Sequence, residues 1–342
     1  MLKWKWLAIL AALLILPAFA ASGGQQEPEK AEKPQSASER FADAVNGWID
    51  ELAGQPGFES WKNATWTRQP LGAGMHGWIV ILKDDEGRET GYLVVAADPQ
   101  GGLSLAEYGL GEYPLFGEKT LHRAMVKHEL IDETVSLRRM MSDPAVKLLR
   151  LYADPFHALW LVTHEGDDYR FDAKTGELLP ADAATLKELL RNMRKARDAA
   201  ETWAPGESGE AAAGKAESAR TAAAGGGTGE AARPKKLKKA AAMEAFDPYY
   251  DLSWLTEDPV AVGNQRQLLA KLDEGRRLVC EVDLYGGAAA FAYAVTGYHR
   301  WDKGGAYIAL EHWGARYVPA GALLRSCTFH EAGSKGEPIW RD

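Results

Sequence analysis

The first regular pattern of apolar residues in this chain has the period of an amphipathic helix. Ser36 and Glu39 have the spacing of a capping box, which predicts a helix N-terminus at this point. The apolar positions that follow at intervals of three and four are Phe41, Ala44, Val45, Trp48, Ile49 and Leu52. Gly54 comes directly after this stretch, so we expect the helix to end there.

Strand-like apolar runs follow the helix, with turn residues between them. They cover 65–70, 78–83, 90–96 and 103–108. The intervals are too short for the crossover connections that parallel strands need, so the runs predict an antiparallel meander. Beyond them we expect a helix over 118–130 and strands over 146–152, 159–164 and 169–172. A further helix should begin at Asp182 and bury Leu186, Leu189, Leu190 and Met193.

The composition changes abruptly after about residue 200. Residues 205–242 are dominated by Ala, Gly, Glu and Lys and contain no aromatic side chain, so they bury too little to fold alone. We therefore predict a disordered linker over 201–242, between domains at 38–200 and 243–342. The last domain should hold a helix over 264–273 and strands over 277–284, 289–298, 306–311 and 316–319. The fold class predicted is α+β, two small domains with antiparallel sheets and flanking helices.

Residues 1–24 have the composition of a secretory signal peptide. Lys3 and Lys5 precede an apolar run that begins at Trp6 and ends in a small-residue exit, which predicts cleavage between Ala20 and Ala21. The run is shorter than the roughly 20 residues that a spanning helix needs, so an uncleaved anchor is the alternative. No cysteine directly follows it to carry a lipid. We predict a signal peptide over 1–20, a flexible lead over 21–37 and an extracytoplasmic location.

The two cysteines, Cys280 and Cys327, both fall in the last predicted domain. In an oxidising compartment such a pair is most simply a disulfide. Two free buried thiols and a catalytic thiol are the alternatives. The net charge of −8 disfavours nucleic acid as a partner. The eight histidines show no metal-ligand spacing, so we predict no cofactor and no metal.

Two stretches of the first domain resemble modules that accompany secreted peptidases. Gly91-Tyr-Leu-Val-Val-Ala-Ala-Asp98, followed by Leu105-Ala-Glu-Tyr108-Gly109, is similar to the propeptide region of streptopain-type cysteine peptidases. The strand that ends in Asp172-Ala-Lys-Thr175-Gly176 resembles a PepSY-type hairpin. In that turn Gly176 should supply a positive φ, while Asp172 and Thr175 bond to turn amides. The resemblance implies a role in inhibiting or regulating a peptidase.

The last domain is similar to the second half of the papain-like C39 peptidases. The similar stretches are Ala294-Val-Thr-Gly297-Tyr298, Tyr307-Ile-Ala-Leu310 and Gly314-Ala-Arg316-Tyr-Val-Pro319. In that family a histidine precedes the Gly-Tyr pair by about six residues, where this chain has Phe291 and Tyr293. The residue that orients this histidine would fall near Glu311 or His312. No cysteine lies between 243 and 279, so the resemblance implies a peptidase-like domain without its nucleophile.

These observations lead to one main hypothesis of function and two rivals. The main hypothesis is a non-catalytic binding or regulatory protein outside the cytoplasm, with an extracellular peptidase or an envelope polymer as its partner. The first rival is an active thiol peptidase that uses Cys280 or Cys327 with His299, His312 or His330. The second is a wall-associated structural protein, tethered to anionic polymer or lipid by the basic cluster of Lys235, Lys236, Lys238 and Lys239.

Overall fold

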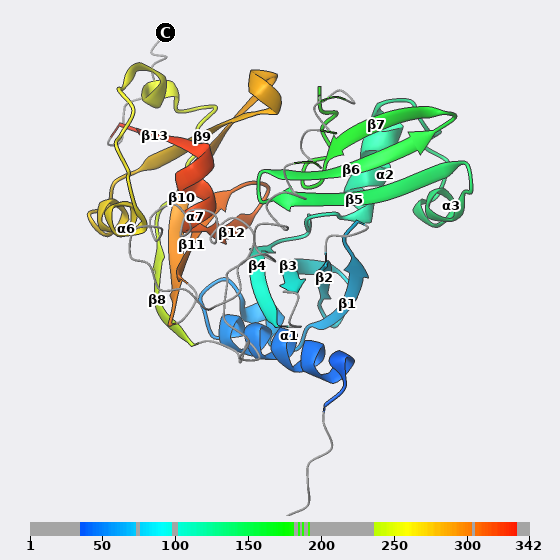
Figure 1. The fold of residues 1–342 in the computed structure, drawn as a ribbon, viewed down its shortest axis with the longest axis horizontal. Helices are drawn as coiled ribbons and strands as arrows, with labels where there is room; N and C mark the ends of the chain where they lie inside the picture. Colours follow the sequence, from blue (N-terminus) through cyan, green and yellow to red (C-terminus); the bar gives the residue numbers. More distant parts are fainter. Residues whose placement is uncertain are drawn as a thin grey trace, which may run out of the picture.

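The computed structural model describes residues 35–72, 76–97, 102–180, 236–302 and 305–333, together with the single residues Ala184, Lys187 and Arg191. The predicted signal peptide with Ala20 and Ala21, the buried face of the helix expected from Asp182, and the linker up to residue 235 lie outside these residues. What is described is an α+β protein with antiparallel sheets and flanking helices (Figure 1). None of the helices in these ranges combines the length and the hydropathy of a membrane span.

The first part of the chain confirms the predicted helix and meander. Helix α1 (Ala37–Ala53) begins with the capping box of Ser36 and Glu39 and has Gly54 as its C-cap. A 3-10 turn, η1 (Glu59–Trp61), leads into four strands that pair antiparallel in chain order. The strands are β1 (Thr65–Pro70), β2 (Gly77–Lys83), β3 (Glu89–Ala97) and β4 (Leu103–Leu110).

Both faces of this meander are buried, because apolar side chains occupy successive positions of β2 and β3. One face shares a core with α1, and its residues are Val80, Leu82, Leu93 and Val95. The other face consists of Ile79, Ile81, Tyr92 and Val94. It packs on α2 (Glu118–Lys127), α3 (Leu137–Ser142) and a three-stranded sheet. The strands of that sheet are β5 (Val146–Asp154), β6 (His157–His164) and β7 (Asp167–Asp172).

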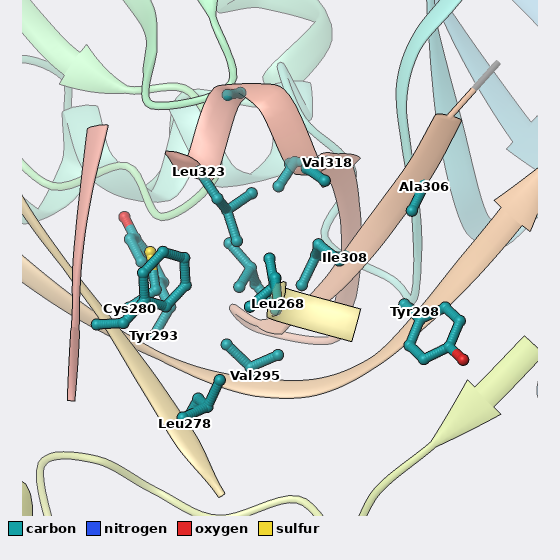
Figure 2. Packing of buried hydrophobic residues seen from close by; sticks show 14 of the residues in the cluster. Leu268, Leu278, Cys280, Tyr293, Val295, Tyr298, Ala306, Ile308, Val318 and Leu323 are labelled. Carbon is teal, nitrogen blue, oxygen red and sulfur yellow. The ribbon is translucent and has the colours of Figure 1, made fainter. Parts of the chain in front are cut away.

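The C-terminal part forms its own core against two helices. The strands are β9 (Leu278–Leu284), β10 (Ala289–Trp301), β11 (Gly305–Glu311), β12 (Ala315–Pro319) and β13 (Cys327–Glu331). Helices α6 (Gln265–Asp273) and α7 (Ala320–Ser326) lie on this sheet, and two 3-10 turns, η2 (Leu252–Thr256) and η3 (Tyr285–Gly287), join the elements. The residues at the centre of the core are Leu268, Leu278, Val295, Ile308, Val318 and Leu323 (Figure 2).

One sheet runs through both predicted domains. Its strand order is β1-β2-β3-β4-β12-β11-β10-β9-β13, and β4 and β12 are the neighbours that join the two parts. In their register Arg316 faces Gly109 and Tyr317 faces Tyr108. The boundary between the parts is therefore a row of strand pairing and packed side chains, which we call the seam.

The structure differs from the predicted linker at its C-terminal end. Leu237–Ala242 form a strand, β8, that pairs antiparallel with β10. The reason is that β10 extends beyond β9, so its residues 297–301 need another partner on that side. Gly297 permits the close approach, since a Cβ there would lie 2.2 Å from the carbonyl oxygen of Ala241. The Lys and Ala composition of 237–242 carries no strand signal.

The predicted disulfide is present. Cys280 of β9 and Cys327 at the start of β13 are bonded, and the chain has no other cysteine. The two strands are neighbours in the sheet, so the bond fastens the last strand to the core. Cys280 is completely buried beside Tyr293 (Figure 2).

Candidate functional site

The turn after β7 has the geometry that its sequence predicts. The Oδ1 atom of Asp172 accepts hydrogen bonds from the backbone N–H groups of Lys174 and Thr175, at 2.8 and 2.7 Å. The hydroxyl of Thr175 donates to the same oxygen at 3.1 Å. Gly176 has a φ of +74°. The turn thereby holds Lys174 between Asp172 and Thr175, and the lysine side chain points toward the seam.

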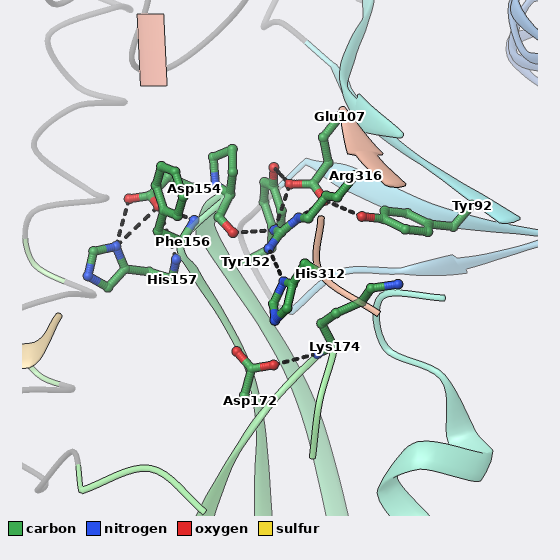
Figure 3. Close-up of polar contacts among 11 residues, drawn as sticks. Tyr92, Glu107, Tyr152, Asp154, Phe156, His157, Asp172, Lys174, His312 and Arg316 are labelled. Carbon is green, nitrogen blue, oxygen red and sulfur yellow. Dashed lines mark hydrogen bonds and ion pairs between the residues drawn. The ribbon is translucent and has the colours of Figure 1, made fainter. Parts of the chain in front are cut away.

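A buried ion pair joins the two parts of the chain at the seam. Glu107 of β4 is fully buried and Arg316 of β12 is 3% exposed. The guanidinium donates two parallel hydrogen bonds to the carboxylate, Nε to Oε1 at 3.1 Å and Nη2 to Oε2 at 3.0 Å (Figure 3). Such a bidentate pair fixes both partners in orientation as well as in distance. Burial alone would lower the pKa of Arg316, but the neighbouring Glu107 outweighs it and raises this pKa well above its usual value.

Neutral groups complete the hydrogen bonding of this ion pair. The hydroxyls of Tyr92 and Tyr152 each donate to Glu107 at 2.8 Å, and the carbonyl oxygen of Pro155 accepts from Arg316. Burial, reinforced by the negative charge of Glu107, raises the pKa of both tyrosines well above its usual value, so they stay protonated donors. Gly109 makes room for the Tyr92 ring, because a Cβ there would lie 2.4 Å from a ring carbon. With its partners the pair connects β3, β4, β5 and β12.

Lys174 is the second buried basic side chain at the seam. Its ammonium group donates to the backbone carbonyl oxygens of Tyr113 and of Trp313, the latter at 3.1 Å. Burial, and after it the positive charge of Arg316, lowers the pKa of Lys174 to about 7. Tyr113 lies in the loop after β4 and Trp313 in the turn between β11 and β12. One side chain therefore fastens two surface loops that come from different parts of the chain.

These two loops present an exposed aromatic pair. The rings of Tyr113 and Trp313 pack edge to face, with centroids 5.4 Å apart and an interplanar angle of 73°. They are 37% and 45% exposed. The guanidinium of Arg123, on α2, lies over both rings, 5.1 Å from the Tyr113 centroid and 5.3 Å from the Trp313 centroid. We call these three residues the aromatic platform.

Trp313 occupies an unfavourable backbone conformation. Its φ is +53°, in the left-handed region that a bulky side chain rarely adopts and that costs of order 1–3 kcal/mol. The next residue, Gly314, is confined by backbone, because a Cβ there would lie 2.6 Å from the carbonyl oxygen of Leu110. The chain thus accepts strain at a residue whose side chain is half exposed. Left-handed residues occur in the tight turns of β-hairpins and also at functional positions, and here the turn between β11 and β12 presents the Trp313 side chain to solvent.

The residues predicted for a thiol peptidase do not form a catalytic group in this structure. Both sulfurs lie in the disulfide. His299 accepts or donates a 2.8 Å hydrogen bond with the Tyr108 hydroxyl, and burial lowers its pKa to about 4. His312 lies 3.5 Å from Arg316, and burial together with this charge lowers its pKa well below the usual value. His330 bonds to Glu281 at 2.9 Å.

Sequence reasoning did not find the residues of the seam or of the aromatic platform. One signal was available, since Glu107 and Arg316 are lone charges within apolar strand patterns, and buried charges are almost always paired. Nothing local indicated that these two would meet, because 209 positions separate them. Across the described ranges, no three His, Cys, Asp or Glu side chains gather in a way that could hold a metal ion.

Comparison of the chain with protein-family models, with curated proteins and with solved structures finds no match. The likeness to streptopain propeptides, PepSY modules and C39 peptidases therefore stays a prediction.

The buried ammonium of Lys174 should make stability depend on pH. Its pKa is about 7 in the folded protein and 10.5 for an ordinary lysine, so the unfolded chain binds more protons between these values. Stability should therefore rise with pH through this window, by about 2 kcal/mol between pH 7 and pH 9. Urea denaturation at the two pH values measures this rise, and Lys174→Met should flatten it. If the free energy of unfolding rose equally between pH 7 and pH 9 in the wild type and in Lys174→Met, the lowered pKa of Lys174 would be contradicted.

Proposed function

We propose that this protein acts outside the cytoplasm as a binding protein that recognises a protein partner through the aromatic platform. The observation that carries this proposal is the exposed Trp313 itself, held in a strained conformation and paired with Tyr113. Trp, Tyr and Arg are the residue types that most often dominate the binding energy of protein interfaces. A buried lysine fixes the loops beneath them, which lowers the entropy that binding would cost.

Two further features support an extracytoplasmic setting. The leader has the parts of a signal peptide, and a structural disulfide is characteristic of oxidising compartments. A regulatory role toward a secreted peptidase accords with the resemblance of the first part of the chain to propeptide and PepSY modules. The rival function, thiol peptidase, would need a free thiolate, and the chain has no cysteine beyond the bonded pair.

The experiment compares three forms of the tagged, purified chain as bait for proteins in the culture fluid and envelope extract of the source organism. They are the wild type, Trp313→Ala, and the matched control Tyr250→Ala, which removes an aromatic residue that is 79% exposed elsewhere. Thermal melts establish that all three are folded. We expect a set of proteins that the wild type and the control retain and that Trp313→Ala loses.

Two results would count against this function. One is equal recovery of every bound protein by the three forms, and the other is repeated failure of the wild type to retain any protein. If a retained protein is a peptidase, hydrolysis of a fluorogenic casein substrate should change when the wild type is added. The same addition of Trp313→Ala should leave that hydrolysis unchanged.

A further inference from the structure

Helix α2 carries a row of three basic residues that includes Arg123 of the aromatic platform. Lys119, Arg123 and Lys127 are spaced four residues apart, and all three are exposed. Residues four apart lie on the same face of a helix, so the three charges form one stripe. The middle residue of the stripe, Arg123, is the one that lies over the Tyr113 and Trp313 rings.

Two members of the stripe have a local structural role, because Arg123 lies over the two rings and Lys127, in the last turn of α2, favours the helix dipole. Among the described residues, none forms a hydrogen bond or ion pair with Lys119, Arg123 or Lys127, although Glu89 attracts Lys119 at longer range. Like charges four apart destabilise a helix, and Lys119 in the first turn also opposes the helix dipole. The chain as a whole carries a net charge of −8. A concentrated positive row on an acidic protein therefore indicates a negatively charged ligand.

The chemistry of Arg123 defines what that ligand presents. A guanidinium that lies on aromatic faces keeps its N–H edges free, and these edges match the two oxygens of a carboxylate. The rings beside it offer apolar contact area to a neighbouring side chain. We infer that the α2 stripe and the aromatic platform together bind an acidic peptide segment that contains an aromatic or apolar residue. This inference rests on the proposed function and names the ligand class of the same site.

A polyphosphate or a wall polymer fits the same surface less well. Repeated phosphates would use the row of charges and leave the edge-to-face ring pair without an apolar contact. A long polyanion would also meet repulsion from the acidic remainder of the chain. A short acidic segment with one aromatic residue uses both the stripe and the rings.

The test measures binding of a fluorescein-labelled peptide in which a tryptophan stands among glutamates, with the glutamine version as its matched control. Fluorescence anisotropy with the full chain at low salt should show binding of the acidic peptide and at least tenfold weaker binding of the glutamine version. Arg123→Ala and Trp313→Ala should each weaken binding tenfold or more. The control Arg300→Ala, which removes an exposed arginine of β10, should leave it unchanged.

The outcomes separate this inference from the proposed function. The inference of an acidic ligand would be overturned if the acidic and glutamine peptides bound equally well. It would also be overturned if Arg123→Ala and Arg300→Ala had the same effect on peptide binding. Both results would hold against it even if Trp313→Ala still lost the natural partner. Unlabelled polyphosphate that competes and depends on Arg123 but not on Trp313 would also overturn it, in favour of a polyanion surface. If the Trp313→Ala variant still binds both the acidic peptide and the natural partner, both proposals are overturned.

Discussion

Replacing Glu107 by Gln should lower the free energy of unfolding by about 3–5 kcal/mol. The substitution keeps the shape of the side chain but leaves the guanidinium of Arg316, 3% exposed, without its counter-charge. Removing one partner of a buried ion pair costs about this much, because the remaining charge stays desolvated. Guanidinium chloride denaturation measures the loss. The control is Glu86→Gln at an exposed hairpin tip, which should show no measurable change.

A double variant shows whether the ion pair stabilises the fold or only fixes which strands pair with each other. Glu107→Met combined with Arg316→Met removes both charges, so no buried charge is left unpaired. Apolar replacement of a buried pair is often neutral or stabilising. Here the Tyr92 and Tyr152 hydroxyls and the Pro155 carbonyl also lose Glu107 and Arg316 as partners, so we expect the double variant to recover only part of the loss. A Glu107→Gln variant within about 1 kcal/mol of the wild type would contradict the seam geometry. The seam geometry would also be contradicted if the double variant lost as much free energy of unfolding as Glu107→Met and Arg316→Met lose together.

Removing the disulfide should have the second largest effect on stability. The bond closes a loop with a sequence separation of 47, for which chain entropy predicts about 3–4 kcal/mol. Replacing both Cys280 and Cys327 by Ala should therefore lower the free energy of unfolding by about this amount. Alanine is preferred to serine because Cys280 is completely buried and a hydroxyl there would lack a partner.

Reductant provides the control for the disulfide prediction. Dithiothreitol should destabilise the wild type toward the level of the double variant and leave the double variant unchanged. Thiol titration of the denatured wild type without reductant should find no free thiol. One reactive thiol per chain under these conditions would contradict the bond and reopen the peptidase hypothesis.

The sequence predicted those elements whose signals are local. The capping box at Ser36 marked the start of α1, and the apolar runs marked β1 to β4 with errors of one or two residues. The turn of Asp172 and Gly176 followed from residue types that suit a positive φ and side-chain-to-amide bonds. Each of these signals depends on neighbours within a few positions.

Features that depend on distant contacts were missed. Strand β8 exists because β10 extends past β9, which its own Lys and Ala residues do not reveal. The pairing of β4 with β12 joins the two predicted domains in one sheet, and no local pattern specifies it. The aromatic platform also needs this pairing, since Tyr113 and Trp313 come from different parts of the chain and meet through Lys174.

The most direct test of the proposed binding function is site-specific photocrosslinking at the aromatic platform. Benzoylphenylalanine replaces Tyr113 in one form of the chain and Tyr250 in the control form. Both are then irradiated in the culture fluid of the source organism. The account predicts a crosslinked protein at position 113 that is absent at position 250 and is competed by excess unlabelled wild type. The same crosslinked proteins at both positions, or none at position 113, would contradict it.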